Sequence, residues 1–193
     1  MASDARVLFY RMLLNKFAPL INESEQRNIE GIKALVNPDD LSVQALLTQY
    51  RSDTYDFGKD YLFTSQRIFE FLTREIKYTP NDMNISFWLT PKEILTSKVS
   101  DDEGLATLLC TALYALGDTK ASVYGMELED LHTHAVVMTT VNEKTLLLDP
   151  SVGHGFFKYY GEKSTVFSRY RFDGKKLKRA LYRFNAETYE QFI

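Results

Sequence analysis

The stretch VSDDEGLATLLCTALYALG, residues 99–117, decides the fold because it carries the clearest helix pattern in the chain. Gly117 follows its last apolar residue as a typical C-terminal stop, since glycine adopts the left-handed conformation without strain. The apolar residues recur with the helical period, at Leu105, Leu108, Leu109, Ala112, Leu113 and Leu116. We therefore expect an apolar helix over 100–116.

The start of this helix is unusually acidic. Ser100 and Glu103 have the S-x-x-E spacing of a capping box, and Asp101 and Asp102 lie between them. Acids in a first helical turn are favoured by the helix dipole without any further function. The only cysteine, Cys110, lines up with the apolar face more than two turns further on, so we expect a buried structural thiol.

Helix patterns precede this segment and strand patterns follow it, which predicts an α+β fold with a central helix packed on an antiparallel sheet. The expected helices cover roughly 5–20, 22–36, 37–50, 60–78 and 90–97, the last with Thr90 as N-cap. A loop is expected over 79–84. The β-rich runs are 120–128, 132–141, 144–151, 165–172 and 175–184, with two-residue turns at Asn142-Glu143 and Asp173-Gly174.

The length of 193 residues suits one domain. We divide it into a helical N-terminal extension (1–60), a core with the motifs (61–155) and a basic C-terminal part (156–193). Residues 6–21 are interrupted by Arg11 and Lys16, so they predict an amphipathic helix rather than a signal peptide or a membrane span. Its apolar face would hold Leu8, Met12, Leu13 and Phe17. A single cysteine excludes an intrachain disulfide and fits a cytoplasmic protein.

Few residues are available for chemistry. His134 lies in a β-rich run, and a hairpin joining 134–141 to 145–149 would bring it near Asp149. A carboxylate beside an imidazole fixes its tautomer and stabilises the imidazolium, as in a nucleophile–His–Asp triad. His132 faces the same side of the strand as His134, and His154 lies in a glycine-flanked loop. A structural role for such a pair is the more common one.

Three ordered blocks resemble the transglutaminase-like superfamily, which has a papain-like fold, in its prokaryotic and archaeal branch. They are FWLTPKEIL (87–95) with the helix at 99–117, then HTHAVVM (132–138), then LLLDPS (146–151). The resemblance covers about residues 35–155. It implies a cysteine nucleophile at the helix start, His134 as the base and Asp149 as the residue that orients it.

The sequence departs from this family at the nucleophile. Aligned without a gap from Trp88 to Gly117, the position of the cysteine falls on Asp102. A carboxylate is stabilised there as a thiolate would be, but it is a poor nucleophile towards an amide. We therefore expect a pseudoenzyme that retains a remnant of the Cys-His-Asp triad and whose cleft, near Asp102, binds a peptide or protein without a cofactor. If the chain is active, the resemblance implies an amide hydrolase or acyltransferase.

Three alternatives stay open. Asp102 could have replaced the cysteine of a hydrolase or acyltransferase in order to inactivate it. Asp102, His134 and Asp149 could bind a divalent metal, with His132 or His154, for metal-dependent hydrolysis; no H-x-x-x-H or H-E-x-x-H spacing supports this, and we assign no metal ligands. Between 158 and 183, nine Lys and Arg residues face only two acids and interleave with aromatics. Such a pattern suits single-stranded nucleic acid, although a solvated hairpin explains it more simply.

Overall fold

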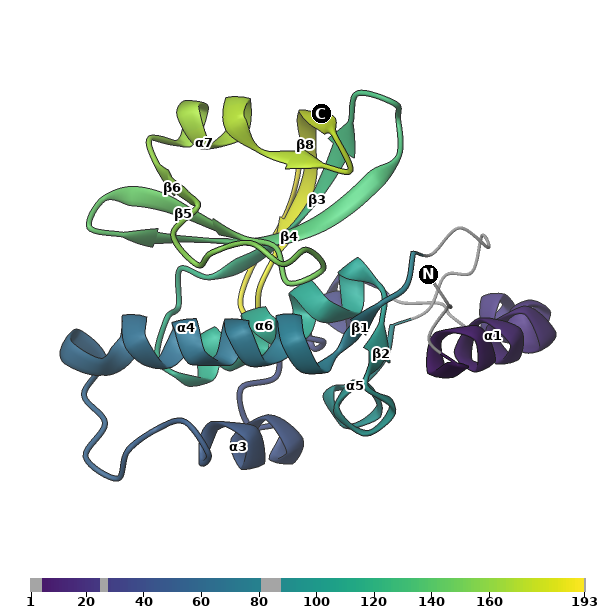
Figure 1. Cartoon of the computed structure of the whole chain (residues 1–193), viewed down its shortest axis with the longest axis horizontal. Helices are drawn as coiled ribbons and strands as arrows, with labels where there is room; N and C mark the ends of the chain where they lie inside the picture. Colours follow the sequence, from purple (N-terminus) through teal and green to yellow (C-terminus); the bar gives the residue numbers. More distant parts are fainter. Residues whose placement is uncertain (1–4, 25–27, 81–87, 193) are drawn as a thin grey trace.

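A computed structural model describes residues 5–24, 28–80 and 88–192. Within these ranges the chain is mainly helical up to residue 115 and mainly strand after it (Figure 1). The helices are α1 (Ala5–Ser24), α2 (Ile29–Lys33), α3 (Leu41–Leu47), α4 (Phe57–Glu75), α5 (Pro91–Ser97), α6 (Asp102–Ala115) and α7 (Lys163–Arg169). The strands are β1 (Lys77–Tyr78), β2 (Val99–Ser100), β3 (Ser122–Leu128), β4 (Thr133–Val141), β5 (Lys144–Leu148), β6 (Tyr159–Gly161), β7 (Arg171–Phe172), β8 (Lys175–Phe184) and β9 (Tyr189–Gln191). The α+β class is confirmed.

The main sheet has seven strands in the order β6-β5-β4-β3-β8-β7, with β9 paired to β8. Each neighbouring pair in it is antiparallel. Both predicted two-residue turns are confirmed: Asn142-Glu143 joins β4 to β5, and Asp173-Gly174 joins β7 to β8, all four residues with positive φ. Positive φ at both central positions gives the turn the twist that antiparallel strands need. A small parallel pair, β1 with β2, stands apart from this sheet.

Helix α6 is the centre of the main core, as the 100–116 pattern predicts. It lies between the sheet and the layer of α3 and α4 (Figure 1). Leu105, Leu109 and Leu113 on α6 have no exposed surface, and Phe69 and Leu72 of α4 pack into the same cluster. Burying each of these leucines contributes about 1.5–3 kcal/mol relative to leaving it exposed.

The predicted capping box at the start of α6 is wrong. The helix is capped by Asp101, whose carboxylate accepts the Gly104 amide at 2.8 Å, and not by a capping box between Ser100 and Glu103. Ser100 is held in β2 by its pairing with Tyr78, so it cannot serve as the cap. The predicted N-cap at Thr90 is confirmed, with a complete capping box.

The run 165–172 is not one strand. Most of it belongs to helix α7, and only Arg171–Phe172 is extended. Val166 and Tyr170 are one helical turn apart and both are buried against the second face of the sheet, in a cluster with Tyr124, Met126 and Tyr159. The helical period of these two residues therefore outweighs the local alternation of apolar and basic side chains.

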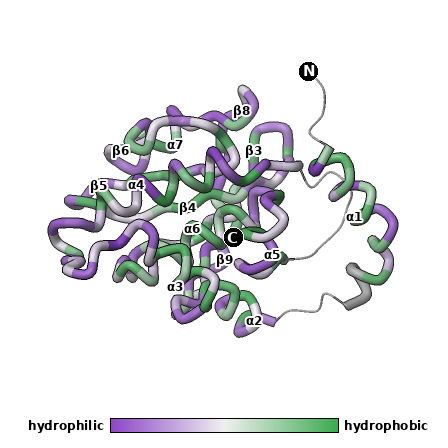
Figure 2. Tube along the Cα trace, turned by 60° about the horizontal axis from the view of Figure 1, so that its bottom comes forward, coloured by the Kyte–Doolittle hydropathy of each residue, from purple (hydrophilic) through white to green (hydrophobic). Residues whose placement is uncertain are grey.

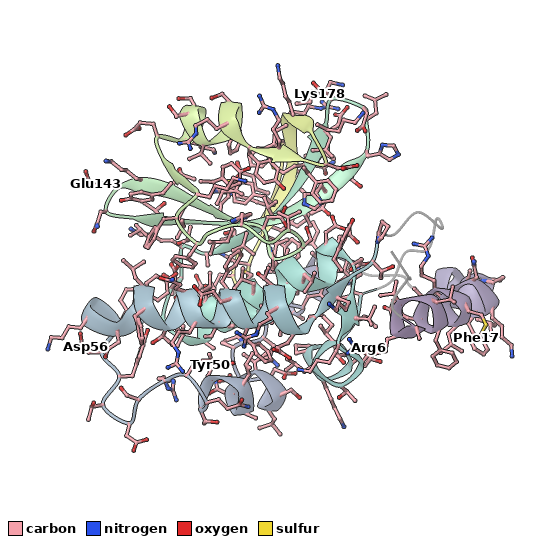
Figure 3. All side chains as sticks on the ribbon, in the orientation of Figure 1. Arg6, Phe17, Tyr50, Asp56, Glu143 and Lys178 are labelled. Carbon is pink, nitrogen blue, oxygen red and sulfur yellow. The ribbon has the colours of Figure 1, made fainter. Side chains whose placement is uncertain are left out.

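Helix α1 extends the expected 5–20 segment, and its expected apolar face is not covered. Leu8, Met12, Leu13 and Phe17 are all exposed. Figure 2 shows α1 beside the body of the molecule, and Figure 3 shows Phe17 pointing away from that body. Arg11 anchors the helix by donating to the carbonyl of Pro80 at 3.2 Å. Most of the loop expected at 79–84 lies outside the described residues. Among the described helices, none combines the length and apolarity needed to cross a membrane.

Candidate functional site

Asp102, His134 and Asp149 form a linear chain of contacts. A carboxylate oxygen of Asp102 lies 3.0 Å from Nδ1 of His134, and one of Asp149 lies 3.0 Å from Nε2. The prediction that these side chains lie within reach of one another is confirmed. Asp102 comes from the first turn of α6, His134 from the start of β4 and Asp149 from the residue after β5. Their catalytic roles stay predictions.

The register of the β4–β5 hairpin explains this geometry. Pairing with β5 begins at Val137 opposite Leu148, so the start of β4 projects beyond the end of β5. The Ala135 amide therefore faces no partner on β5, and it donates instead to Asp102 at 2.7 Å. The Asp102 carboxylate thus joins the mouth of α6 to the sheet through two contacts, one with a ring nitrogen and one with a backbone amide.

Asp149 is held by a further set of donors. Its second oxygen accepts the amide of Ser151 at 3.0 Å and the hydroxyl of Ser151 at 2.5 Å, while the Tyr170 hydroxyl donates to the oxygen that contacts His134. The Asp149 amide donates to Nε2 of His154 at 3.2 Å. Because every neighbour is a donor, this fully buried carboxylate is held in its ionised form.

The pKa values follow from these contacts. Burial by itself lowers the pKa of His134, but the hydrogen bonds that its ring donates to Asp102 and Asp149, together with their charges, outweigh burial and raise the pKa to about 9. Burial raises the pKa of Asp149, and the hydrogen bond and charge of His134 hold it below its ordinary value. At neutral pH the imidazole is therefore a cation with a proton on each nitrogen, and it cannot act as a base.

The imidazole is closed off from solvent. The Phe172 ring stacks on it with centroids 3.7 Å apart, and Tyr78 of β1 packs edge-on against Phe172 at 6.0 Å. The side chain of His134 is 1% exposed, and that of Asp102 is 11% exposed. The β7–β8 hairpin therefore covers the imidazole, while the cleft expected near Asp102 stays a prediction. At the start of α6, Asp102 keeps a narrow exposed edge and Glu103 is partly exposed.

The other candidate residues are not part of this chain of contacts. His132 precedes β4, its side chain is 82% exposed, and it pairs with Asp130 at 3.3 Å. His154 meets the chain of contacts at the Asp149 amide, and its ring packs against Phe69 and Tyr159. Cys110 is fully buried, and burial raises the pKa of its thiol, so it is the expected structural residue. Within the described ranges, no group of three or more His, Cys, Asp and Glu side chains is arranged to hold a metal ion.

The two acids that flank Asp102 have raised pKa values that could not be predicted from the sequence. Burial raises the pKa of Asp101 to about 7 and that of Glu103 to about 8, and the other carboxylates of the helix start add to both effects. Glu103 has a hydrogen bond with Tyr182 of β8. The three successive acids are visible in the sequence, but nothing local indicates that the first would be buried or that the third would meet Tyr182.

The aromatic residues of the basic C-terminal part serve mainly as core. Tyr159 and Tyr170 are buried in the second cluster, where their ring centroids lie 5.0 Å apart. Lys178 and Arg179 both pair with Glu127, at 2.7 and 2.6 Å. Buried rings cannot stack on bases, so these features favour the solvated-hairpin interpretation of this segment over a single-stranded nucleic-acid groove.

No protein-family model and no curated protein sequence matches the chain. Solved structures of LapG from Legionella pneumophila do share its fold. An EGTA-treated form has a TM-score of 0.55 at 15% identity and covers 94% of this chain and 85% of that chain. A second LapG structure has a TM-score of 0.56 at 16% identity, with 93% and 86% covered. A calcium-bound form has a TM-score of 0.51 at 20% identity, with 77% and 85% covered. The chain thus has a transglutaminase-like, papain-like fold.

Proposed function

We propose that this chain is a transglutaminase-like domain without cysteine chemistry, a pseudoenzyme that binds a peptide or protein beside the mouth of α6. The observation that carries the proposal is the state of Asp102. This residue stands where the family resemblance places the nucleophile, and its carboxylate is bound to His134 and to the Ala135 amide. A carboxylate engaged in this way is a poor nucleophile towards an amide, and the acyl-enzyme it would form is an anhydride, which lies far above an amide in free energy.

The closed imidazole supports the same proposal. In a Cys–His pair, the histidine must take the thiol proton and later return it. Here both ring nitrogens face carboxylates and Phe172 covers one face of the ring. The three side chains form an ion-paired bridge that joins helix α6 to the sheet, and this bridging role supports the pseudoenzyme proposal.

A group of partly exposed aromatic rings beside this mouth supports peptide or protein binding. Tyr182 and Tyr189 stack with centroids 6.4 Å apart, and Trp88 packs edge-on against Phe184 at 5.9 Å. Tyr182 reaches Glu103 at the helix start. Partly exposed Tyr and Trp side chains are typical anchors of binding interfaces. A cytoplasmic location is part of this proposal, in keeping with a single buried cysteine.

Thiol labelling tests the chemical half of the proposal. Native wild-type protein should take up no iodoacetamide and hydrolyse no peptide in a random library. The Asp102→Cys thiol should react at lower pH than the thiol of Asp53→Cys, because the helix start and His134 stabilise a thiolate. Asp53→Cys is an exposed control whose thiol should have an ordinary pKa of about 8.5. Native wild-type labelling that disappears in Cys110→Ser would overturn the pseudoenzyme proposal. An Asp102→Cys thiol no more reactive than the control would overturn the triad remnant.

A peptide selection tests the binding half. A displayed library of random 12-residue peptides should yield binders whose affinity falls at least tenfold in Tyr189→Ser. The control Lys176→Gln removes a charge from the outer part of β8 and should change the affinity less than twofold. Binders that respond equally to both variants would place recognition elsewhere and contradict the binding surface.

The alternative that Asp102 replaces the cysteine of an active hydrolase or acyltransferase is supported by one observation: the carboxylate lies 3.0 Å from a ring nitrogen, where a thiolate would form its ion pair. The Asp102→Cys variant distinguishes this inactivated enzyme from a pseudoenzyme. Restored turnover of a peptide or acyl-transfer substrate would favour the inactivated enzyme, whereas a reactive thiol without turnover favours the pseudoenzyme.

A further inference from the structure

One polar cavity lies on the face of the main sheet that α6 does not cover. Figure 1 shows helix α7 on this face, on the side of the sheet opposite α6. The cavity has a volume of about 420 Å³, and its lining includes Tyr124 of β3 and Met138 of β4, which belong to the second core cluster. Asp102, His134 and Asp149 do not line it, so it is separate from the site described above.

Three cations stand around this cavity. Lys120 lies in the loop after α6, Lys163 begins α7, and Arg183 belongs to β8. Glu187 is the acid among the described lining residues. Three positive side chains from three separate elements, against one acid, favour an anionic ligand.

The two lysines are not neutralised by ion pairs. Among the described residues, neither Lys120 nor Lys163 has an acid within ion-pair distance, and the Lys163 Nζ atom lies 5.8 Å from the ring centroid of Tyr124. Arg183 donates from Nε to Glu190 at 2.7 Å, but both side chains of this pair are exposed and such pairs are weak in water. The positive charge of the lining is therefore available to a ligand.

Two buried hydroxyl groups in the lining each have a proton to donate. Ser122 is 5% exposed and Tyr124 is 6% exposed. The Ser122 hydroxyl accepts a hydrogen bond from Nδ2 of Asn185 at 3.2 Å. The Tyr124 hydroxyl accepts one from Nη1 of Arg183 at 3.1 Å. In the part of the chain that the structure describes, neither hydroxyl has an acceptor for its own proton, and a buried donor favours a ligand that supplies one.

Asn185 fixes the Ser122 hydroxyl as a donor. The Asn185 side-chain oxygen accepts the backbone amides of Glu187 and Thr188, at 3.0 and 2.8 Å. The group that faces Ser122 is therefore the NH₂ of Asn185, which can only donate. Since the Ser122 oxygen accepts from this NH₂ group, its own proton is left for another acceptor.

We propose that this cavity binds a phosphoryl group, either of free phosphate or of a small polar phosphate monoester. A phosphate monoester carries about 1.5 to 2 negative charges at neutral pH and has three acceptor oxygens. Three cations and two hydroxyl donors match it better than they match a carboxylate, which has one charge and two oxygens. The volume is within the range of about 300–1,000 Å³ for small-molecule sites, and Thr140 and Thr145 line the remaining space with hydroxyl groups.

Isothermal titration of the whole chain in low salt tests this proposal with four probes: inorganic phosphate, glucose 6-phosphate, glucose and acetate. Both phosphates should bind at least tenfold more tightly than acetate, and glucose should not bind. The ratio between the two phosphates identifies the source of the phosphoryl group. Tighter binding of glucose 6-phosphate supports a monoester, and tighter binding of inorganic phosphate supports the free ion.

Three variants locate the binding. Lys163→Gln removes an exposed cation, so the variant should fold normally and bind glucose 6-phosphate at least tenfold more weakly. Tyr124→Phe removes the hydroxyl donor and keeps the ring, and it should weaken the binding at least threefold. The control Lys176→Gln makes the same charge change on an exposed lysine at the other end of β8, and its effect should be less than twofold.

The outcomes are distinct from those that test the Asp102 site. Amide chemical shifts should move at Ser122 and Asn185 when glucose 6-phosphate is added, and not at Ala135. No binding of either phosphate at millimolar concentration, equal affinity for acetate, or equal losses in Lys163→Gln and Lys176→Gln would each overturn the proposal. None of these results bears on whether the α6 mouth binds a peptide.

Discussion

Raising the pH from 6 to 9.5 should destabilise this protein through His134. The pKa of His134 is raised to about 9 in the folded chain, against about 6.5 in an unfolded one. The sign follows from linkage: the imidazolium stabilises the fold fully below pH 6.5, and that stability is lost as the pH rises through 9. Since a tenfold change in an equilibrium constant is about 1.4 kcal/mol, the loss is about 3 kcal/mol.

Two carboxyl groups act in the same direction. Asp101 and Glu103 have pKa values raised to about 7 and about 8, so both lose in the folded state a proton that the unfolded chain has already lost at lower pH. Their losses add to the loss of about 3 kcal/mol from His134, while the lowered pKa of His154 acts in the opposite direction. With a urea m-value of about 2 kcal/mol/M, the His134 contribution alone should lower the urea midpoint by about 1.5 M between pH 6 and pH 9.5.

Asp102→Asn is the matched variant for this experiment. One oxygen of Asp102 contacts both the Ala135 amide and Nδ1 of His134, and the Asn oxygen can accept a hydrogen bond from each of them in the same place. The shape is retained while one charge is lost, so the pH-dependent loss of stability should shrink. The chain has three histidines, so His134 can be followed directly by NMR. A folded His134 that titrates at or below 6.5, or an equal urea midpoint at both pH values, would refute the reasoning.

Three further predictions concern the core. Leu109→Ala should lower the free energy of unfolding by about 2–5 kcal/mol, measured by urea denaturation, because Leu109 has no exposed surface in the main cluster. Gly125→Ala should cost about 1–3 kcal/mol, since an added Cβ would overlap the Tyr182 ring, and the loss should be smaller in a Tyr182→Ser background; an equal loss in both backgrounds would contradict this. Cys110 should not react with a disulfide reagent in the folded protein and should react once per chain in urea, because it is fully buried; fast native reaction would contradict that placement.

The parts of the fold that are specified locally could be predicted from the sequence. The apolar period of α6, Gly117 after it and the Asn142-Glu143 turn depend on residues a few positions apart, and all three are present in the structure. The contact between His134 and Asp149 could also be predicted, because one hairpin brings them together.

The parts of the fold that depend on packing between residues far apart in the sequence could not be predicted. The β7–β8 hairpin places Phe172 on the imidazole of His134, although nothing near either residue in the sequence indicates the other. Ser100 and Asp101 are both good N-cap residues, and only the pairing of β2 with β1 decides between them. Helix α7 forms because Val166 and Tyr170 are buried by strands that lie elsewhere in the chain.

The bond between the Ala135 amide and Asp102 has a consequence for any substitution at position 102. That amide lies where β5 no longer pairs with β4, so the Asp102 carboxylate accepts the hydrogen bond that a strand carbonyl would otherwise accept. A cysteine at position 102 would be at best a weak acceptor for it, and a buried amide without an acceptor costs about 1–3 kcal/mol. A change of Asp102 to cysteine would therefore bring a folding defect with it. Position 102 can accept a thiol without that loss of stability only after a second change supplies Ala135 with another acceptor.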